Sequence, residues 1–267
     1  MQEQITDNRP IGMFDSGVGG LTVYKEIKKQ MPNEKIIYLG DTEKFPYGSK
    51  SKQTIIELTK KNIDFLLKLD VKEIIIACGT ATSQALDEVK KIYNIPIEGI
   101  IMPTVEYIVE KQNYKNIGII ATRGTIRSNA WENEIKAKRK DINIYNKECP
   151  LLAPMAEEGW TENEIARLTI KEYIKEFPKL DALILGCTHY PMFENVIKEY
   201  MPDVDIINTG KIIAQCLEKR LHRNKILEPK EDEIYLTDTE CNFINVATTI
   251  LQKNIIIKKA EVDSNEK

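Results

Sequence analysis

Short, wholly apolar segments alternate with longer segments of helical periodicity along almost the entire chain. Residues 74–77 and 183–185 are apolar at every position, which is the pattern of a strand that is buried on both faces. In 55–67 and 165–177, apolar residues recur at three- and four-residue spacing, which predicts helices with one buried face. We therefore expect an α/β protein in which helices cover mostly parallel sheets. The strands are expected at residues 11–14, 35–39, 73–77, 97–101, 117–121, 142–146, 182–185, 204–207, 233–237 and 255–260.

The composition excludes several classes of protein. With 38 Lys and Arg against 41 Asp and Glu, the net charge is −3, and no basic block marks a surface for nucleic acid or an anionic membrane. No apolar segment approaches the roughly 20 residues of a membrane helix, and the polar start of the chain is unlike a signal peptide. Five cysteines, an odd number, are unlike a disulfide framework and are typical of thiols in a reducing cytoplasm. We therefore expect a cytoplasmic protein without nucleic-acid or membrane partners.

Two parts of the chain resemble each other weakly. Segment 11–17 is similar to segment 117–123, and segment 75–78 is similar to segment 184–187. Asp15 and Cys78 are separated by nearly the same length of chain as Thr122 and Cys187, which predicts two similar three-layer α/β halves. Because ligands bind at the carboxyl ends of parallel strands, such halves would form a site in the cleft between them.

Four polar clusters, at 15–20, 78–82, 122–125 and 187–191, follow apolar strands. Each combines a side chain able to exchange a proton with small residues that let a ligand approach the backbone. Simpler interpretations exist, since a cysteine after a strand is more often a small buried apolar residue. Asp15 or Ser16 could also merely cap a helix that begins near Leu21. His222, among basic residues at an expected helix end, is assigned no role.

The sequence gives little support for a metal or a nucleotide cofactor. Cys187 and His189 are possible metal ligands, but no further cysteine pair or histidine cluster completes a tetrahedral zinc site. The glycines at 17, 19 and 20 do not have the spacing of a dinucleotide motif or of a phosphate-binding loop. A nicotinamide enzyme and an NTPase are therefore not expected.

Cys78 and Cys187, at equivalent positions of two facing halves, suggest a different chemistry. A thiol has a pKa of about 8.5, which neighbouring groups and burial shift in either direction. A thiolate on one side of a carbon atom could remove a proton while a thiol on the other side delivers one, which inverts the configuration. This symmetry suits a racemase, because either enantiomer must serve as substrate.

Six segments form an ordered set along the chain. They are FDSGVGGLTV at 14–23, GD at 40–41 with FPYG at 45–48, ACGTA at 77–81, ATRGT at 121–125, CP at 149–150 with EEG at 157–159, and GCTHYP at 186–191. Over nearly its whole length the chain thereby resembles the cofactor-independent aspartate/glutamate racemase superfamily, and within it the glutamate racemases. Each segment is short, but their order and spacing together are specific.

The resemblance implies interconversion of L- and D-glutamate with neither a metal nor a cofactor such as pyridoxal phosphate. It implies that Cys78 and Cys187 are the acid/base pair, that Asp15 assists Cys78, and that His189 and Glu157 assist Cys187. Asp15 and His189 would also line the substrate site. The other motif positions implied to line it are Ser16, Pro46, Tyr47, Gly48, Gly79, Thr80, Thr122 and Thr188.

The resemblance further implies two discontinuous domains, 1–98 plus 209–267 and 99–208, a homodimer, and a role in supplying D-glutamate for peptidoglycan. One position departs from the family pattern, because Gly79 replaces the asparagine of the usual Cys-Asn-Thr-Ala. We interpret this as altered substrate binding, since the residues that would perform the chemistry are all present. A racemase of aspartate or a related amino acid, and a non-catalytic relative that retains the pocket, stay open as alternatives.

Overall fold

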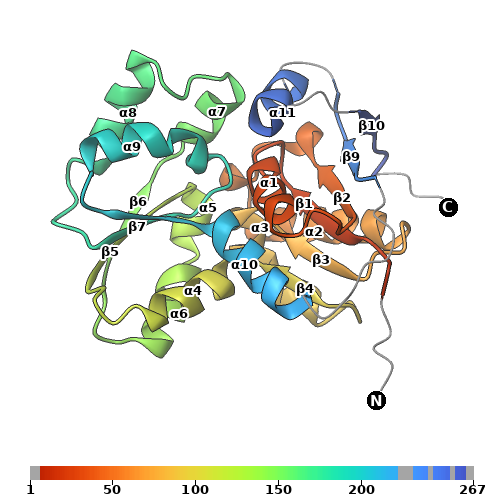
Figure 1. The fold of residues 1–267 in the computed structure, drawn as a ribbon, viewed down its shortest axis with the longest axis horizontal. Coiled ribbons are helices and arrows are strands. Elements are labelled where there is room, and N and C mark those ends of the chain that lie inside the picture. Colours follow the sequence, from red (N-terminus) through yellow and green to blue (C-terminus); the bar gives the residue numbers. More distant parts are fainter. Residues whose placement is uncertain (1–6, 222–230, 240–242, 253–255, 263–267) are drawn as a thin grey trace.

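The computed structural model describes residues 7–221, 231–239, 243–252 and 256–262. Two sheets lie side by side, with helices on the faces of each (Figure 1). The first sheet has the strand order β10-β9-β2-β1-β3-β4, the second has the order β6-β5-β7-β8, and the described pairings in both are parallel. The predicted α/β class is therefore confirmed.

Each of the ten expected strands is present, although residue 255, at the start of the last, lies outside the described residues. Their bounds are β1 (Ile11–Asp15), β2 (Ile36–Gly40), β3 (Glu73–Ile76), β4 (Ile97–Gly99), β5 (Asn116–Ala121), β6 (Asn143–Glu148), β7 (Ala182–Leu185), β8 (Asp205–Asn208), β9 (Glu233–Leu236) and β10 (Ile257–Lys259).

Helices follow most strands, and those expected in 55–67 and 165–177 are α2 and α8. The helices of the described residues are α1 (Leu21–Gln30), α2 (Lys52–Leu67), α3 (Gly79–Lys90), α4 (Ile101–Glu110), α5 (Arg123–Arg127), α6 (Ala130–Lys138), α7 (Leu152–Glu157), α8 (Glu164–Ile174), α9 (Glu194–Tyr200), α10 (Thr209–Leu221) and α11 (Phe243–Leu251). Short 3₁₀ turns are η1 (Thr42–Lys44), η2 (Tyr47–Ser49) and η3 (Tyr190–Phe193). None of the helices in the described part of the chain is long and apolar enough to cross a bilayer.

The wholly apolar segments 74–76 of β3 and 183–185 of β7 have a direct physical cause. In β3, the side chain of Ile75 packs into one hydrophobic cluster, whereas Ile74 and Ile76 pack into another on the opposite face of the sheet. In β7, Ile184 and Leu183 are divided between two clusters in the same way. Because both faces are covered, residues 74–76 of β3 and 183–185 of β7 are all apolar, whereas Glu73, the first residue of β3, pairs with Arg220.

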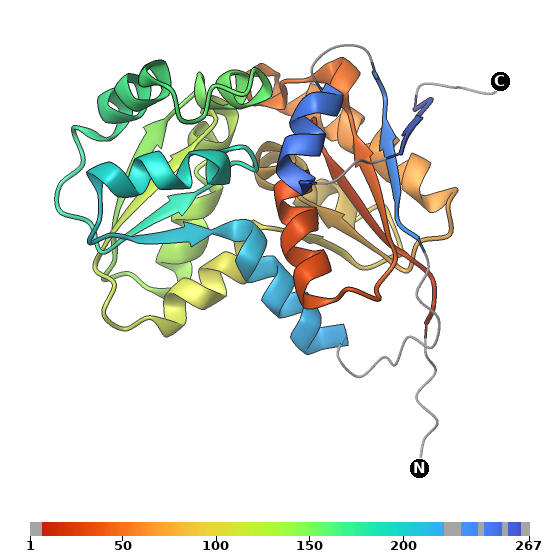
Figure 2. The ribbon, with the colours of Figure 1, turned by 45° about the horizontal axis from the view of Figure 1, so that its top comes forward.

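One hydrophobic cluster runs from the first sheet to the second. It includes Met13 of β1, Ile119 of β5 and Ile213 of α10. Helix α10 packs against α1 and α4 at the junction of the two sheets (Figure 1), and α11 packs against α1 (Figure 2). The two sheets therefore share a continuous core on this side of the molecule.

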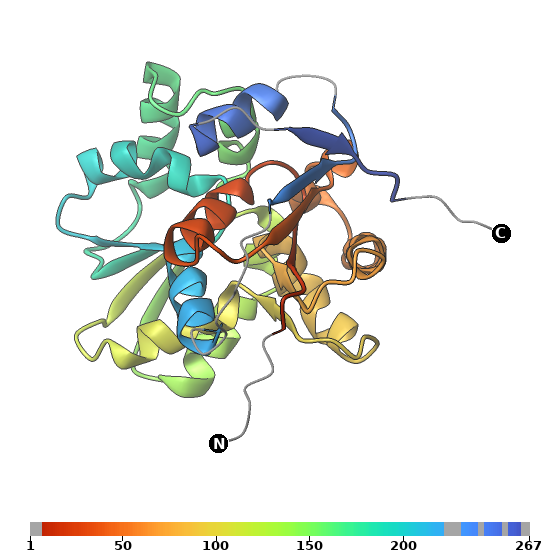
Figure 3. The ribbon, with the colours of Figure 1, turned by 45° about the vertical axis from the view of Figure 1, so that its right-hand side comes forward.

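The weak internal similarity corresponds to a repeated topology. The order β2-β1-β3-β4 in the first sheet has the same form as β6-β5-β7-β8 in the second. Strands β9 and β10 extend the first sheet beyond β2 (Figure 3), so the last part of the chain returns to the half that contains its start. Strands β1 and β5 are equivalent, as are β3 and β7, while the predicted domain boundaries at 98 and 209 stay a prediction.

Candidate active site

The two cysteines lie at equivalent strand ends, Cys78 directly after Ala77 beyond β3 and Cys187 directly after Gly186 beyond β7. Cys78 is the N-cap of α3, where its sulfur accepts a hydrogen bond from the backbone N–H of Ala81 at 3.5 Å. The two residues are 4% and 7% exposed, so both thiols are largely shielded from water. Their neighbours Gly79 and Gly186 contact each other across the boundary between the halves. The topology thus brings the predicted pair to one place.

Asp15 lies at the end of β1 beside Cys78. Its carboxylate accepts hydrogen bonds from the backbone N–H of Gly17 at 3.1 Å and from Thr188 Oγ1, in the other half, at 3.2 Å. Burial raises the pKa of Asp15, whereas the charge of His189 lowers it. Helix α1 has Gly20 as its N-cap, so the alternative in which Asp15 or Ser16 is merely that cap residue is wrong.

The thiol of Cys78 is held in its protonated form. Burial and the nearby carboxylate of Asp15 raise the pKa of Cys78 to about 12, although hydrogen bonds with Ala81 and Ser16 act in the opposite direction. Its sulfur donates to Ser16 Oγ at 3.6 Å. At neutral pH, Cys78 is therefore a proton donor in this arrangement.

Cys187 has the opposite electrostatic surroundings. Its sulfur lies 3.8 Å from Nδ1 of His189, and Nε2 of the same ring lies 2.5 Å from Oε1 of Glu157. Burial lowers the pKa of His189, but hydrogen bonds and charge interactions with Cys187 and Glu157 outweigh it and raise that pKa well above its usual value. The imidazole ring of His189 thus lies between the Glu157 carboxylate and the Cys187 sulfur and can exchange a proton with that sulfur.

Three threonine hydroxyls meet where the halves adjoin. Thr80 Oγ1 of α3 lies 2.8 Å from Thr122 Oγ1 and 3.4 Å from Thr125 Oγ1, and these last two oxygens are 3.0 Å apart. Thr122 is the N-cap of α5 and accepts from the backbone N–H of Thr125. Thr125 belongs to the predicted polar cluster 122–125 but was not among the residues expected to line the substrate site.

The segment that precedes α2 is fixed by a buried network. Tyr47 donates its hydroxyl hydrogen to Asp41 and accepts from Asn62 Nδ2 at 3.0 Å, while Thr237 Oγ1 donates to Asp41 at 3.1 Å. Tyr47 is 1% exposed, so its hydroxyl is committed to this network. Thr237 follows β9, and the returning end of the chain therefore supports the segment.

Gly48 and Pro46 have different surroundings from Tyr47. A Cβ at Gly48 would overlap Thr122, which shows that the segment lies directly against the three threonines. Pro46 is exposed. The structure thus brings Gly48, Thr80 and Thr122 together but gives Tyr47 a supporting position.

We expect the buried network to contribute measurably to stability. Tyr47→Phe removes a hydrogen bond to the buried carboxylate of Asp41, and we expect the free energy of unfolding to fall by about 1–3 kcal/mol. Tyr93→Phe is a control, because the half-buried Tyr93 also donates to a carboxylate, that of Asp64 at 2.7 Å, but through a solvent-exposed hydrogen bond, where the expected change is within about 0.5 kcal/mol. Urea unfolding of both variants measures the difference. Equal losses would contradict the structural role assigned to Tyr47.

The halves contact each other around the cysteines. Thr22 Oγ1 donates to the backbone oxygen of Thr188 at 2.8 Å, and Gln84 Nε2 donates to that of Gly124 at 2.9 Å. The ring of Phe45 packs 5.6 Å from that of His189, centroid to centroid. The site is therefore enclosed by contacts between the halves.

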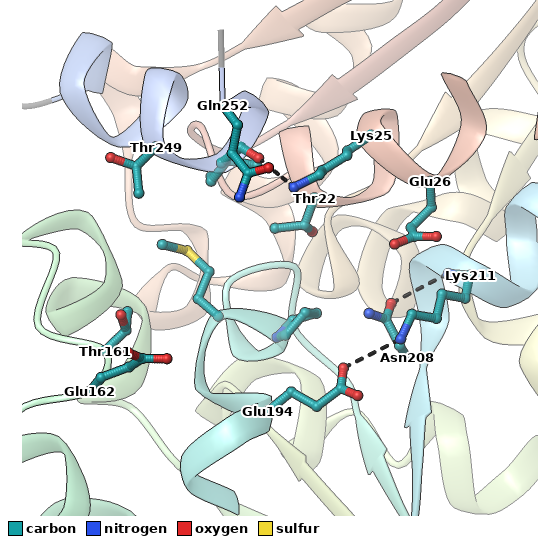
Figure 4. A pocket seen from close by; sticks show the side chains of 13 residues that line it. Thr22, Lys25, Glu26, Thr161, Glu162, Glu194, Asn208, Lys211, Thr249 and Gln252 are labelled. Atoms are coloured by element: carbon teal, nitrogen blue, oxygen red, sulfur yellow. Dashed lines mark hydrogen bonds and ion pairs between the residues drawn. The ribbon is translucent and has the colours of Figure 1, made fainter. Parts of the chain in front are cut away.

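A separate cavity of about 370 Å³ adjoins residues 191–194 (Figure 4). It is lined by α1, α11, the end of β8 and residues 191–194, and Thr22 belongs to its wall. Within it, Lys25 donates to the backbone oxygen of Ile250, and Lys211 lies 3.6 Å from Glu194. None of the predicted site residues lines this cavity.

Metal-ligating side chains are not clustered in the described part of the chain, where no group of three or more His, Cys, Asp or Glu is placed to hold an ion. Cys187, His189 and Glu157 instead form a line of hydrogen bonds. His222, which was given no role, lies outside the described residues.

Two buried thiols lie on facing α/β halves, one beside a carboxylate and the other beside a histidine–glutamate pair, and this arrangement can both donate and accept protons. The chain belongs to the Asp/Glu/Hydantoin racemase family, whose model matches residues 11–217. It is therefore a racemase, and thus an isomerase.

The similar proteins agree with this assignment. The chain is 43% identical to a glutamate racemase of Sulfurihydrogenibium sp. over 95% of this chain and 97% of the relative. Its structure resembles that of glutamate racemase from Francisella tularensis in complex with D-glutamate, with a TM-score of 0.89, 37% identity, and coverage of 96% of this chain and 99% of the other. Glutamate racemase from Aquifex pyrophilus is also similar, with a TM-score of 0.80, 38% identity, and coverage of 94% and 98%.

Proposed function

We propose that this racemase interconverts L- and D-glutamate, with Cys78 and Cys187 as the two groups that exchange protons with the α-carbon. The observation that carries the proposal is the opposite surroundings of two buried thiols at equivalent strand ends. Asp15 disfavours the thiolate of Cys78, whereas the sulfur of Cys187 lies against His189, which is hydrogen-bonded to Glu157. One acid and one base are therefore ready at the same time.

The proton balance of one turnover follows from these charges. The thiolate of Cys187 takes the α-proton, the electrons of the broken C–H bond stay on the α-carbon, and the thiol of Cys78 donates its proton to the opposite face. Cys187 is then a thiol and Cys78 a thiolate, which is the arrangement that the reverse reaction needs. A further turnover in the same direction requires both sulfurs to exchange protons with their surroundings.

The carbanion-like transition state needs electrostatic stabilisation, because an α-proton is far less acidic than a thiol. We propose that Ser16, Thr188 and the three threonine hydroxyls hold the substrate carboxylates. The N-terminus of α3, which begins directly after Cys78, adds backbone N–H groups and a favourable dipole. Enclosure between the halves would strengthen each of these interactions by excluding water.

The similarity to glutamate racemases also supports proposals about the oligomeric state, cellular location and metabolic role of the protein. We propose that the protein works as a homodimer in the cytoplasm, with glutamate as its small-molecule partner, and supplies D-glutamate for peptidoglycan. Light scattering of the purified protein tests the dimer, for which a mass of twice 30.7 kDa is expected.

We expect the purified protein to convert L-glutamate to an equal mixture of enantiomers without added pyridoxal phosphate. L-Aspartate is shorter by one methylene, so we expect its kcat/KM to be lower by about 10–200-fold. Chiral chromatography of both reactions measures these rates. Preference for aspartate would support the related-amino-acid alternative, and binding of glutamate without turnover would support the non-catalytic one.

A further inference from the structure

The backbones of the two halves approach each other closely directly beside both cysteines. Gly79 follows Cys78 at the start of α3, and Gly186 precedes Cys187 at the end of β7. A Cβ at position 79 would lie well inside 3.0 Å of the Gly186 carbonyl oxygen, which is a separation that real Cβ atoms essentially never show. The contact therefore requires glycine at position 79.

The backbone conformation at position 79 does not itself require glycine. Among the described residues, Gly159 is the glycine with a positive φ, whereas Gly79 is the first residue of an α-helix. An L-residue could adopt this backbone without strain. The nearby carbonyl, rather than the local conformation, thus excludes a side chain.

Hydrogen bonds hold the backbone on both sides of the contact. Gly186 donates its N–H to the carbonyl of Ile120 at 2.8 Å, and a Cβ of its own would be only 3.0 Å from Ala121 Cβ. On the other side, Thr82 fixes the first turn of α3 by donating its hydroxyl hydrogen to the carbonyl of Ile76 at 3.1 Å. A side chain at position 79 therefore has to push the halves apart.

Such a displacement would change the positions of both sulfur atoms. The Gly186 carbonyl belongs to the peptide group that continues into Cys187, and Gly79 shares a peptide group with Cys78. We propose that Gly79 is a positioning residue, and that its missing side chain sets the separation of the Cys78 and Cys187 sulfurs in the closed site. This inference rests on the proposed function, because the separation matters for a substrate carbon held between the sulfurs.

The test compares Gly79→Ala and Gly79→Asn with Gly12→Ala. Gly12 is a matched control in β1, since a Cβ there would meet only the side-chain ends of Val71 and Leu66 at 3.2–3.3 Å. Because a misplacement of about 1 Å can cost about 100-fold in rate, we expect kcat to fall about 10–100-fold for both Gly79 variants. The fall should be similar in both directions, with KM changed by less than about threefold, because both sulfurs move relative to one substrate carbon.

A second measurement does not depend on turnover. The rate at which iodoacetamide alkylates Cys78 and Cys187, followed by mass spectrometry, reports how accessible the two thiols are to the reagent. Native circular dichroism of each variant shows that the protein is folded. We expect faster alkylation of both thiols in the Gly79 variants and no change in Gly12→Ala.

The two measurements separate the inference from the proposed function. Unchanged kcat and unchanged alkylation in Gly79→Ala and Gly79→Asn would overturn the inference while leaving an active racemase. A wild-type protein that does not racemise glutamate would overturn the function, whereas the alkylation rates would still test how Gly79 spaces the thiols.

Discussion

Cys78→Ala and Cys187→Ala each lower kcat for glutamate racemisation by about 1,000-fold or more in both directions. Each direction needs one sulfur as base and the other as acid, and removal of either leaves a face of the α-carbon without a proton donor or acceptor. Chiral chromatography of L- and D-glutamate reactions measures both rates.

Cys149→Ala is the matched control for these variants. Cys149 is also a fully buried cysteine, but its sulfur contacts the backbone oxygen of Lys147 rather than the other two thiols. We expect its kcat to stay within about threefold of the wild-type value, since no acid–base role is removed. Near-normal turnover in either direction by Cys78→Ala or Cys187→Ala would contradict the two-cysteine assignment.

Asp15→Asn and His189→Asn each lower kcat by about 100-fold. In each variant, the loss of kcat differs between the L-to-D and the D-to-L reaction. Asp15 raises the pKa of Cys78, whereas His189 contacts the sulfur of Cys187, so each substitution disturbs a different acid–base partner. The enantiomers have equal free energies, so kcat/KM must fall equally in both directions, and the asymmetry appears in kcat and KM separately.

The direction of the asymmetry distinguishes the two residues. We expect the direction with the larger loss of kcat to be opposite in Asp15→Asn and His189→Asn. Full progress curves started from each enantiomer give the four constants for each variant. Equal losses of kcat in both directions for both variants would show that the residues do not serve separate cysteines.

The strands and the cysteine positions were predictable because they depend on local patterns. Apolar residues at each position of 74–76 and 183–185 predict strands buried on both faces, and the structure confirms them in β3 and β7. The similarity of the segments before Cys78 and Cys187 predicts equivalent strand ends, and the matching strand orders confirm it.

The missed features depend on contacts between distant residues. Thr237 supports Tyr47 only because β9 adds to the sheet beside β2, and no local pattern specifies that neighbour. The commitment of the Tyr47 hydroxyl to Asp41 was missed for the same reason. The contact between Gly79 and Gly186 depends on how closely the two halves approach each other, which neither segment encodes by itself.

The central claim is that protons leave and reach the α-carbon on opposite faces through different sulfurs. Racemisation of L-glutamate in D₂O, stopped early and analysed by mass spectrometry of the separated enantiomers, tests it most directly. We predict that the D-glutamate formed carries deuterium at the α-carbon, while the recovered L-glutamate retains its original hydrogen. D-Glutamate that keeps the original α-hydrogen would show a single group acting on both faces, and would contradict the account.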